Sequence, residues 1–79
     1  MTPFLESLME GSPHYRVEQR GNMVSFQATG DTEDTVTLFQ PTVERLRKNE
    51  GDGYSIYNEH PTSSFGYNLI DLVVVELEE

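Results

Sequence analysis

The feature that most constrains the fold of this chain is a tight turn between two short segments of alternating apolar and polar residues. Residues 15–19 and 23–28 flank Arg20-Gly21-Asn22, and a two-residue Gly21-Asn22 loop provides the positive φ angles that hairpin turns require. The implied register pairs residues of like character on each face: Val17 with Phe26 and Tyr15 with Ala28, and on the other face Glu18 with Ser25 and Arg16 with Gln27. We therefore predict an antiparallel hairpin with one buried face.

A short amphipathic helix is predicted before the hairpin. Thr2 can act as its N-cap, Pro3 suits its first position, and Gly11 and Pro13 end it. Its apolar residues recur at helical spacing: Phe4, Leu5, Leu8 and Met9. Because so short a helix is not stable alone in water, we expect its apolar stripe to pack on the rest of the domain, with a contact to a partner as the alternative.

Two interpretations are open for residues 31–40. The β-branched residues of segment 35–39 and the alternation of Val36 and Leu38 favour a third strand. The alternative is a helix that is capped by Asp31 or Thr32 and runs to Gln40. Residues 41–49 are predicted to be helical in either case. Pro41 suits the first turn of a helix, and Gly51 follows the end of the segment. The charges agree with a helix dipole, since Glu44 is early and Arg47 and Lys48 are late.

The last third of the chain is predicted to form two strands. Residues 54–59 alternate after a turn at 51–53, residues 60–66 are interpreted as a loop, and residues 67–77 are nearly continuously apolar, which is typical of a strand in the middle of a sheet. A chain of 79 residues forms at most one small domain. The predicted fold is a single compact α+β domain over residues 1–79, with a short N-terminal helix, a β-hairpin, one further helix and a mainly antiparallel sheet of four or five strands.

Motifs for catalysis or ligand binding are not found in the sequence. There is no cysteine, and neither His14 nor His60 has the spacing of a metal ligand. The carboxylates Asp31, Glu33 and Asp34 do not follow the pattern of a calcium loop. We expect no enzyme, no cofactor and no metal site. No signal peptide or long apolar segment is present, so we expect a soluble cytoplasmic protein.

The distribution of charge carries the functional hypothesis. The chain has 14 acidic and 5 basic residues and a net charge of −9, which disfavours direct binding to nucleic acid or to an anionic membrane. All basic residues precede residue 49, whereas seven carboxylates follow it: Glu50, Asp52, Glu59, Asp71, Glu76, Glu78 and Glu79. Such a surface can serve solubility alone, or it can bind a basic groove of a protein partner.

Aromatic residues accompany these carboxylates, since Tyr54, Tyr57, Phe65 and Tyr67 lie within fourteen residues of one another. We hypothesise a non-enzymatic small acidic binding or regulatory protein that docks an electronegative, tyrosine-bearing surface on a basic protein partner. In its specific form it is an inhibitor that imitates nucleic-acid charge, as small phage-encoded proteins can. The candidate partner-binding residues are Glu50, Asp52, Tyr57, Glu59, Phe65, Tyr67 and Glu76. The alternative is a structural or assembly module that forms a homodimer through an edge strand or the N-terminal helix.

Overall fold

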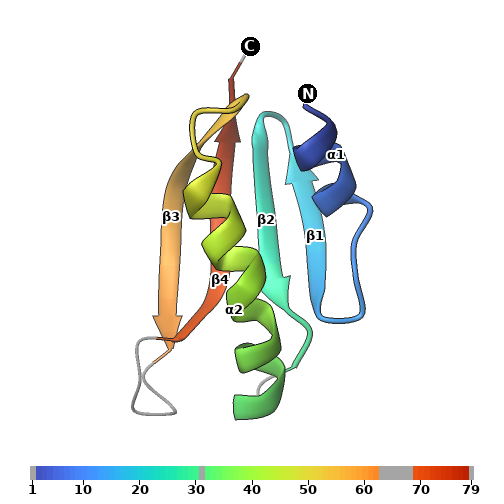
Figure 1. The fold of residues 1–79 in the computed structure, drawn as a ribbon, viewed down its shortest axis with the longest axis vertical. Coiled ribbons are helices and arrows are strands. Elements are labelled where there is room, and N and C mark those ends of the chain that lie inside the picture. Colours follow the sequence, from blue (N-terminus) through green and yellow to red (C-terminus); the bar gives the residue numbers. More distant parts are fainter. Residues whose placement is uncertain (1, 31, 63–68, 79) are drawn as a thin grey trace.

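The helices of this protein cover one face of an antiparallel sheet, as the computed structural model shows (Figure 1). The structure describes residues 2–30, 32–62 and 69–78. The elements in chain order are α1 (Pro3–Met9), β1 (Tyr15–Arg20), β2 (Met23–Ala28), α2 (Glu33–Lys48), β3 (Tyr54–Thr62) and β4 (Leu69–Leu77). The sheet has four strands in the order β1-β2-β4-β3, and all neighbouring strands are antiparallel. The predicted α+β class is therefore confirmed, with the lower of the two expected strand numbers.

The predicted hairpin is confirmed residue by residue. β1 and β2 pair in the expected register, with Val17 opposite Phe26 and Tyr15 opposite Ala28. Gly21 has a φ of 62°, but Asn22 does not share this conformation, since only glycines have a positive φ among the described residues. A positive φ at the first central position alone agrees with a type II′ turn, which needs glycine at that position only.

Helix α1 packs on its own domain, as expected from its apolar stripe. The Thr2 hydroxyl oxygen accepts a hydrogen bond from the Leu5 backbone N–H at 3.3 Å, so the predicted N-cap is present. Leu5 and Leu8 are buried in the core, and Phe4 and Met9 are partly buried against it. The two leucines are therefore not available as a surface for a partner.

The prediction of a strand at 35–39 is wrong, because these residues belong to α2. This helix begins after the N-cap Thr32, which forms a reciprocal capping box with Thr35. It continues through Pro41, whose ring lies on the exposed side of the helix. The buried residues of α2 follow a helical period and face the sheet: Val36, Phe39, Val43 and Leu46. Burial of this stripe outweighs the preference of the β-branched residues for a strand.

Strand β3 is longer than predicted and contains two irregularities in its pairing with β4. Its register shifts between Ile56 and Asn58, where Tyr57 is an extra residue on β3, and again opposite His60 and Pro61, where Asp71 is an extra residue on β4. The predicted loop is therefore wrong for residues 60–62, while 63–66 lie outside the described residues, as do 67 and 68 of the last predicted strand. Pro61 is compatible with a strand here because β3 is at the edge of the sheet.

The core lies between the helices and the sheet, and two buried tyrosines attach the helices to its edge strands. Tyr15 begins β1, and its hydroxyl donates to the Leu8 carbonyl of α1 at 2.7 Å; Tyr54 begins β3, and its hydroxyl donates to the Leu46 carbonyl of α2 at 2.7 Å. Carbonyls in the last turn of a helix have no partner within the helix, and each tyrosine donates to one of them. The Leu8 carbonyl also accepts from the Gly11 N–H at 3.1 Å. The buried apolar residues of the core are Leu5, Leu8, Tyr15, Val24, Phe26, Ala28, Val36, Phe39, Val43, Leu46, Tyr54, Ile70, Val73 and Val75.

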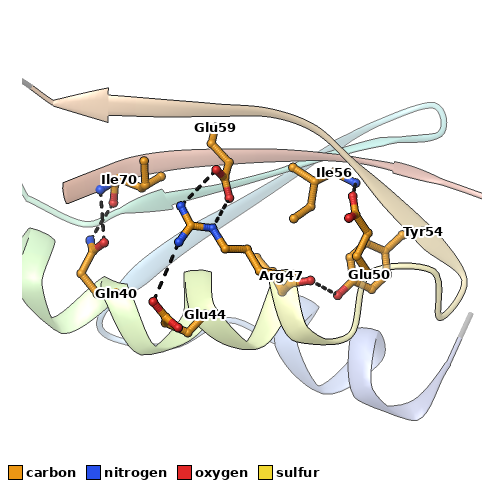
Figure 2. Close-up of polar contacts among 9 residues, drawn as sticks. Gln40, Glu44, Arg47, Glu50, Tyr54, Ile56, Glu59 and Ile70 are labelled. Carbon is orange, nitrogen blue, oxygen red and sulfur yellow. Dashed lines mark hydrogen bonds and ion pairs between the residues drawn. The ribbon is translucent and has the colours of Figure 1, made fainter. Parts of the chain in front are cut away.

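A third polar link joins α2 to the central strand β4. The Gln40 side-chain oxygen accepts from the Ile70 N–H at 3.2 Å, and its nitrogen donates to the Ile70 carbonyl at 2.8 Å (Figure 2). The same nitrogen donates to the Val36 carbonyl at 2.7 Å. Gln40 therefore pairs with the Ile70 backbone much as a neighbouring strand would.

We expect Gln40→Met to lower the free energy of unfolding by about 1–2 kcal/mol, because it leaves the Ile70 backbone groups without these partners. The measurement is a urea unfolding curve. Gln27→Met on the exposed part of β2 is the matched control and is expected to change stability by less than about 0.5 kcal/mol. Equal unfolding midpoints for the two variants would contradict this role of Gln40.

Candidate partner-binding surface

Four carboxylates gather at one end of the sheet, around the turn between α2 and β3 and the end of β4, both at the top of Figure 1. We define the acidic end by these residues: Glu50, Asp52, Glu76 and Glu78. The Glu78 N–H donates to the Gly53 carbonyl at 2.9 Å, and Glu76 pairs with Ser55 in the register of β3 and β4. The end of β4 is thus held directly against the turn, and the carboxylates of the two segments share one region.

The electrostatics of this region act on Tyr54. Burial is the main cause that raises the pKa of the Tyr54 hydroxyl, and the negative charges of Asp52 and then Glu50 add to it, so that the pKa is about 12. Asp52, Glu76 and Glu78 are exposed, and none of the three makes an ion pair within the described part of the chain. Glu50 is also exposed, but its carboxylate accepts from the Ile56 N–H at 2.7 Å and so helps to order the start of β3 (Figure 2).

Glu59 does not belong to this exposed acidic surface. Its carboxylate faces α2 and accepts two hydrogen bonds from the Arg47 guanidinium, at 2.6 Å from Nε and 3.1 Å from Nη2 (Figure 2). The hydrogen bond to Glu59 is the largest cause that raises the pKa of Arg47. Glu44 lies 3.9 Å from the same guanidinium. The charge of Glu59 is therefore balanced by Arg47, so Glu59 is not part of the exposed acidic surface.

The extra residue Tyr57 explains why Glu59 faces the helix. In a regular strand Glu59 would point away from the face of Ile56, which packs against the core. The irregularity at Tyr57 shifts the alternation by one residue, so that Glu59 pairs with the buried Val73 and lies on the helix side. Tyr57 itself is 69% exposed.

The remaining candidates are distributed elsewhere. Asp71 is on the other half of β4, where its carboxylate is 2.8 Å from the His60 ring nitrogen Nδ1. Phe65 and Tyr67 lie outside the described residues, as does Glu79. The seven carboxylates of the C-terminal part therefore do not form one surface. Glu78 was missing from the candidate residues, although the period of two in a strand places it on the same face as Glu76.

Other functional sites are not found in the parts of the chain that the structure describes. No group of three or more His, Asp or Glu side chains there could hold a metal ion. Neither helix within the described ranges has both the length and the apolar composition needed to cross a membrane. Comparison with known proteins gives no match, whether to a family model, to a curated protein or to a solved structure.

Proposed function

We propose that this protein is a non-enzymatic binding or regulatory protein that docks its acidic end on a basic protein partner. The observation that carries the proposal is that Asp52, Glu76 and Glu78 are exposed, close together and not paired with cations in the described residues. Glu76 belongs to a central strand, Glu78 follows that strand, and Asp52 lies in a turn bonded to it, so little backbone freedom is lost on binding.

Tyr57 supplies the aromatic part of the proposed surface. It lies two residues along β3 from Ser55, the partner of Glu76, which corresponds to about 7 Å. An exposed tyrosine beside carboxylates buries a large area at a low cost in side-chain entropy. In the specific form of the proposal, the partner is a nucleic-acid-binding protein whose basic groove accepts the carboxylates in place of phosphates.

The experiment compares two variants with the same change in net charge. The test variant is Asp52→Asn with Glu76→Gln and Glu78→Gln. The control variant is Glu10→Gln with Glu33→Gln and Asp34→Asn, which are exposed residues away from the acidic end. Both variants change the net charge from −9 to −6, because each removes three negative charges. Glu50 and Glu59 are left unchanged because their carboxylates stabilise the fold.

Immobilised wild-type protein is first used to capture basic partners from a cell lysate at low salt. The association rates of the two variants are then measured with the purified partner. We expect the test variant to associate at least about tenfold more slowly than the control variant at low salt, because the surface field acts chiefly on the association rate. High salt should remove the difference. Release of the partner by duplex DNA would support the specific form. Equal rates for the two variants would reduce the acidic end to a solubility feature.

A further inference from the structure

The face of the sheet opposite the helices, here called the open face, is not covered by any described element (Figure 1). The strand registers arrange its side chains in three rows across β1, β2, β4 and β3. The rows are Arg16, Gln27, Leu72 and His60; then Glu18, Ser25, Val74 and Asn58; then Arg20, Met23, Glu76 and Ser55. None of these residues is fully buried, although Leu72, Val74 and Met23 form an apolar strip on the two central strands.

The charges of the open face are separated between its two sides. Arg16 and Arg20 lie on β1, and Arg20 binds Glu18 of the same strand at 2.7 Å, whereas Arg16 has no ion pair in the described residues. On the other half, Glu76 of β4 is in the third row, and the Asp71 carboxylate is 2.8 Å from the ring of His60 in the first row. The face is therefore basic along one edge and acidic toward the other, a pattern that can be complementary to itself.

The shape of the open face has the same two-sided character. A hollow of about 270 Å³ lies at β1 and β2, and its lining residues are Arg16, Val17, Glu18, Ser25 and Gln27. On the opposite edge of the sheet, Tyr57 is the extra residue of β3, and it is 69% exposed. An exposed aromatic residue and this hollow therefore lie at opposite edges of the sheet.

We propose that a second copy of this chain packs on the open face, with a two-fold axis that runs parallel to the strands between the two sheets. Such an axis reverses the strand order, so that β1 lies over β3 and β2 over β4 of the second copy. This arrangement places Arg16 over His60 and Arg20 over Ser55 of the other copy, one strand away from its Asp71 and Glu76. It also places Tyr57 over β1, which lines the hollow. An axis across the strands would instead place β1 on β1, with arginines facing arginines.

The size of the face predicts a weak dimer. Four strands about 4.8 Å apart and rows about 7 Å apart form a face of roughly 20 by 20 Å, so a dimer would bury about 800 Å² in total, which is less than a stable specific interface buries. We expect half of the protein to be dimeric at a concentration on the order of 100 μM and low salt. This association goes beyond the proposed binding of a basic partner and is tested with the purified protein alone, so either proposal can fail without the other.

The test is sedimentation equilibrium up to about 1 mM protein, in low salt, with two charge-reversed variants. The first is Arg16→Glu with Arg20→Glu, and the second is Asp71→Lys with Glu76→Lys. Each alone should dimerise at least about tenfold more weakly than the wild type, and an equimolar mixture should recover the wild-type affinity, because every contact in the mixed dimer again joins opposite charges. Tyr57→Ser, an exposed change with little effect on folding, should also weaken the dimer.

The control is Glu6→Lys with Glu10→Lys, two exposed residues in α1 and at its C-cap, which changes the net charge from −9 to −5, as the second variant does. If reduced charge repulsion alone governed association, the control and the second variant would both dimerise more tightly than the wild type. The proposal instead expects the control to dimerise at least as well as the wild type and the second variant to dimerise more weakly. A monomeric wild type at 1 mM, taken as roughly ten times the expected midpoint, would overturn the proposal. An equimolar mixture of the two charge-reversed variants that dimerises no more tightly than either variant alone would overturn it as well. So would a Tyr57→Ser protein that dimerises with the affinity of the wild type.

Discussion

Replacing Phe39 with alanine is expected to lower the free energy of unfolding by about 3–5 kcal/mol, the largest effect that we predict for a single substitution. Phe39 is fully buried in the middle of the apolar stripe of α2, and its ring centroid is 6.0 Å from that of Tyr15. The substitution leaves a cavity between α2 and the sheet. A domain of this size has a total stability of the same order, so the variant should be largely unfolded at 37 °C.

The neighbouring residue provides the control for this prediction. Leu38 lies on the same helix but is 53% exposed, so Leu38→Ala should change stability by less than about 1 kcal/mol. Thermal and urea unfolding of both variants measure the difference. If Phe39→Ala and Leu38→Ala were equally stable, the orientation of α2 on the sheet would have to be revised.

The second large effect is a loss of stability at alkaline pH. Burial, with a smaller contribution from Asp52 and Glu50, raises the pKa of Tyr54 from 10.0 to about 12 in the folded protein. The folded state therefore holds the phenolic proton more tightly than the unfolded state. This contribution is fully present below pH 10 and is lost as the pH rises from about 10 to 12, which amounts to about 3 kcal/mol.

Tyr54→Phe separates this effect from other alkaline changes. It removes the titrating hydroxyl and the hydrogen bond to Leu46, so the variant should be less stable at neutral pH but should lose less stability between pH 10 and 12. A residual decrease is expected from Tyr15, whose pKa is also raised, chiefly by burial. The measurement is the urea midpoint of both proteins across this pH range; parallel curves would show that Tyr54 is not responsible.

The elements that could be predicted are those whose signals are local. The hairpin register follows from the period of two around Gly21, a position that needs a positive φ. Helix α1 follows from the Thr2 cap and the spacing of its apolar residues. For segment 35–39 the local signal is misleading, because β-branched residues favour a strand locally, whereas burial of Val36 and Phe39 against the sheet favours the helix.

The candidate surface could be predicted only in part, because it also depends on contacts between segments that are distant in the chain. Sequence placed Glu50, Asp52 and Glu76 in the acidic C-terminal part, and the structure brings their segments together at one end of the sheet. The sequence could not reveal that Glu59 binds Arg47, because that contact depends on the irregularity at Tyr57. Irregular pairing arises from the fit of two strands to each other and to the helix above them, and it leaves no periodic signal in either strand.

The sequence by itself therefore determined the hairpin, the N-cap of α1, the α+β class and the excess of carboxylates after residue 49. The tertiary structure decided that β4 lies between β2 and β3, that residues 33–48 form one helix, and which carboxylates remain exposed without a cation in the described residues. The physical reason is the separation along the chain of the residues that interact. Turn angles, capping and periodicity act between residues close in the chain, whereas strand order, helix burial and ion pairing are set by contacts between segments that meet only when the core forms.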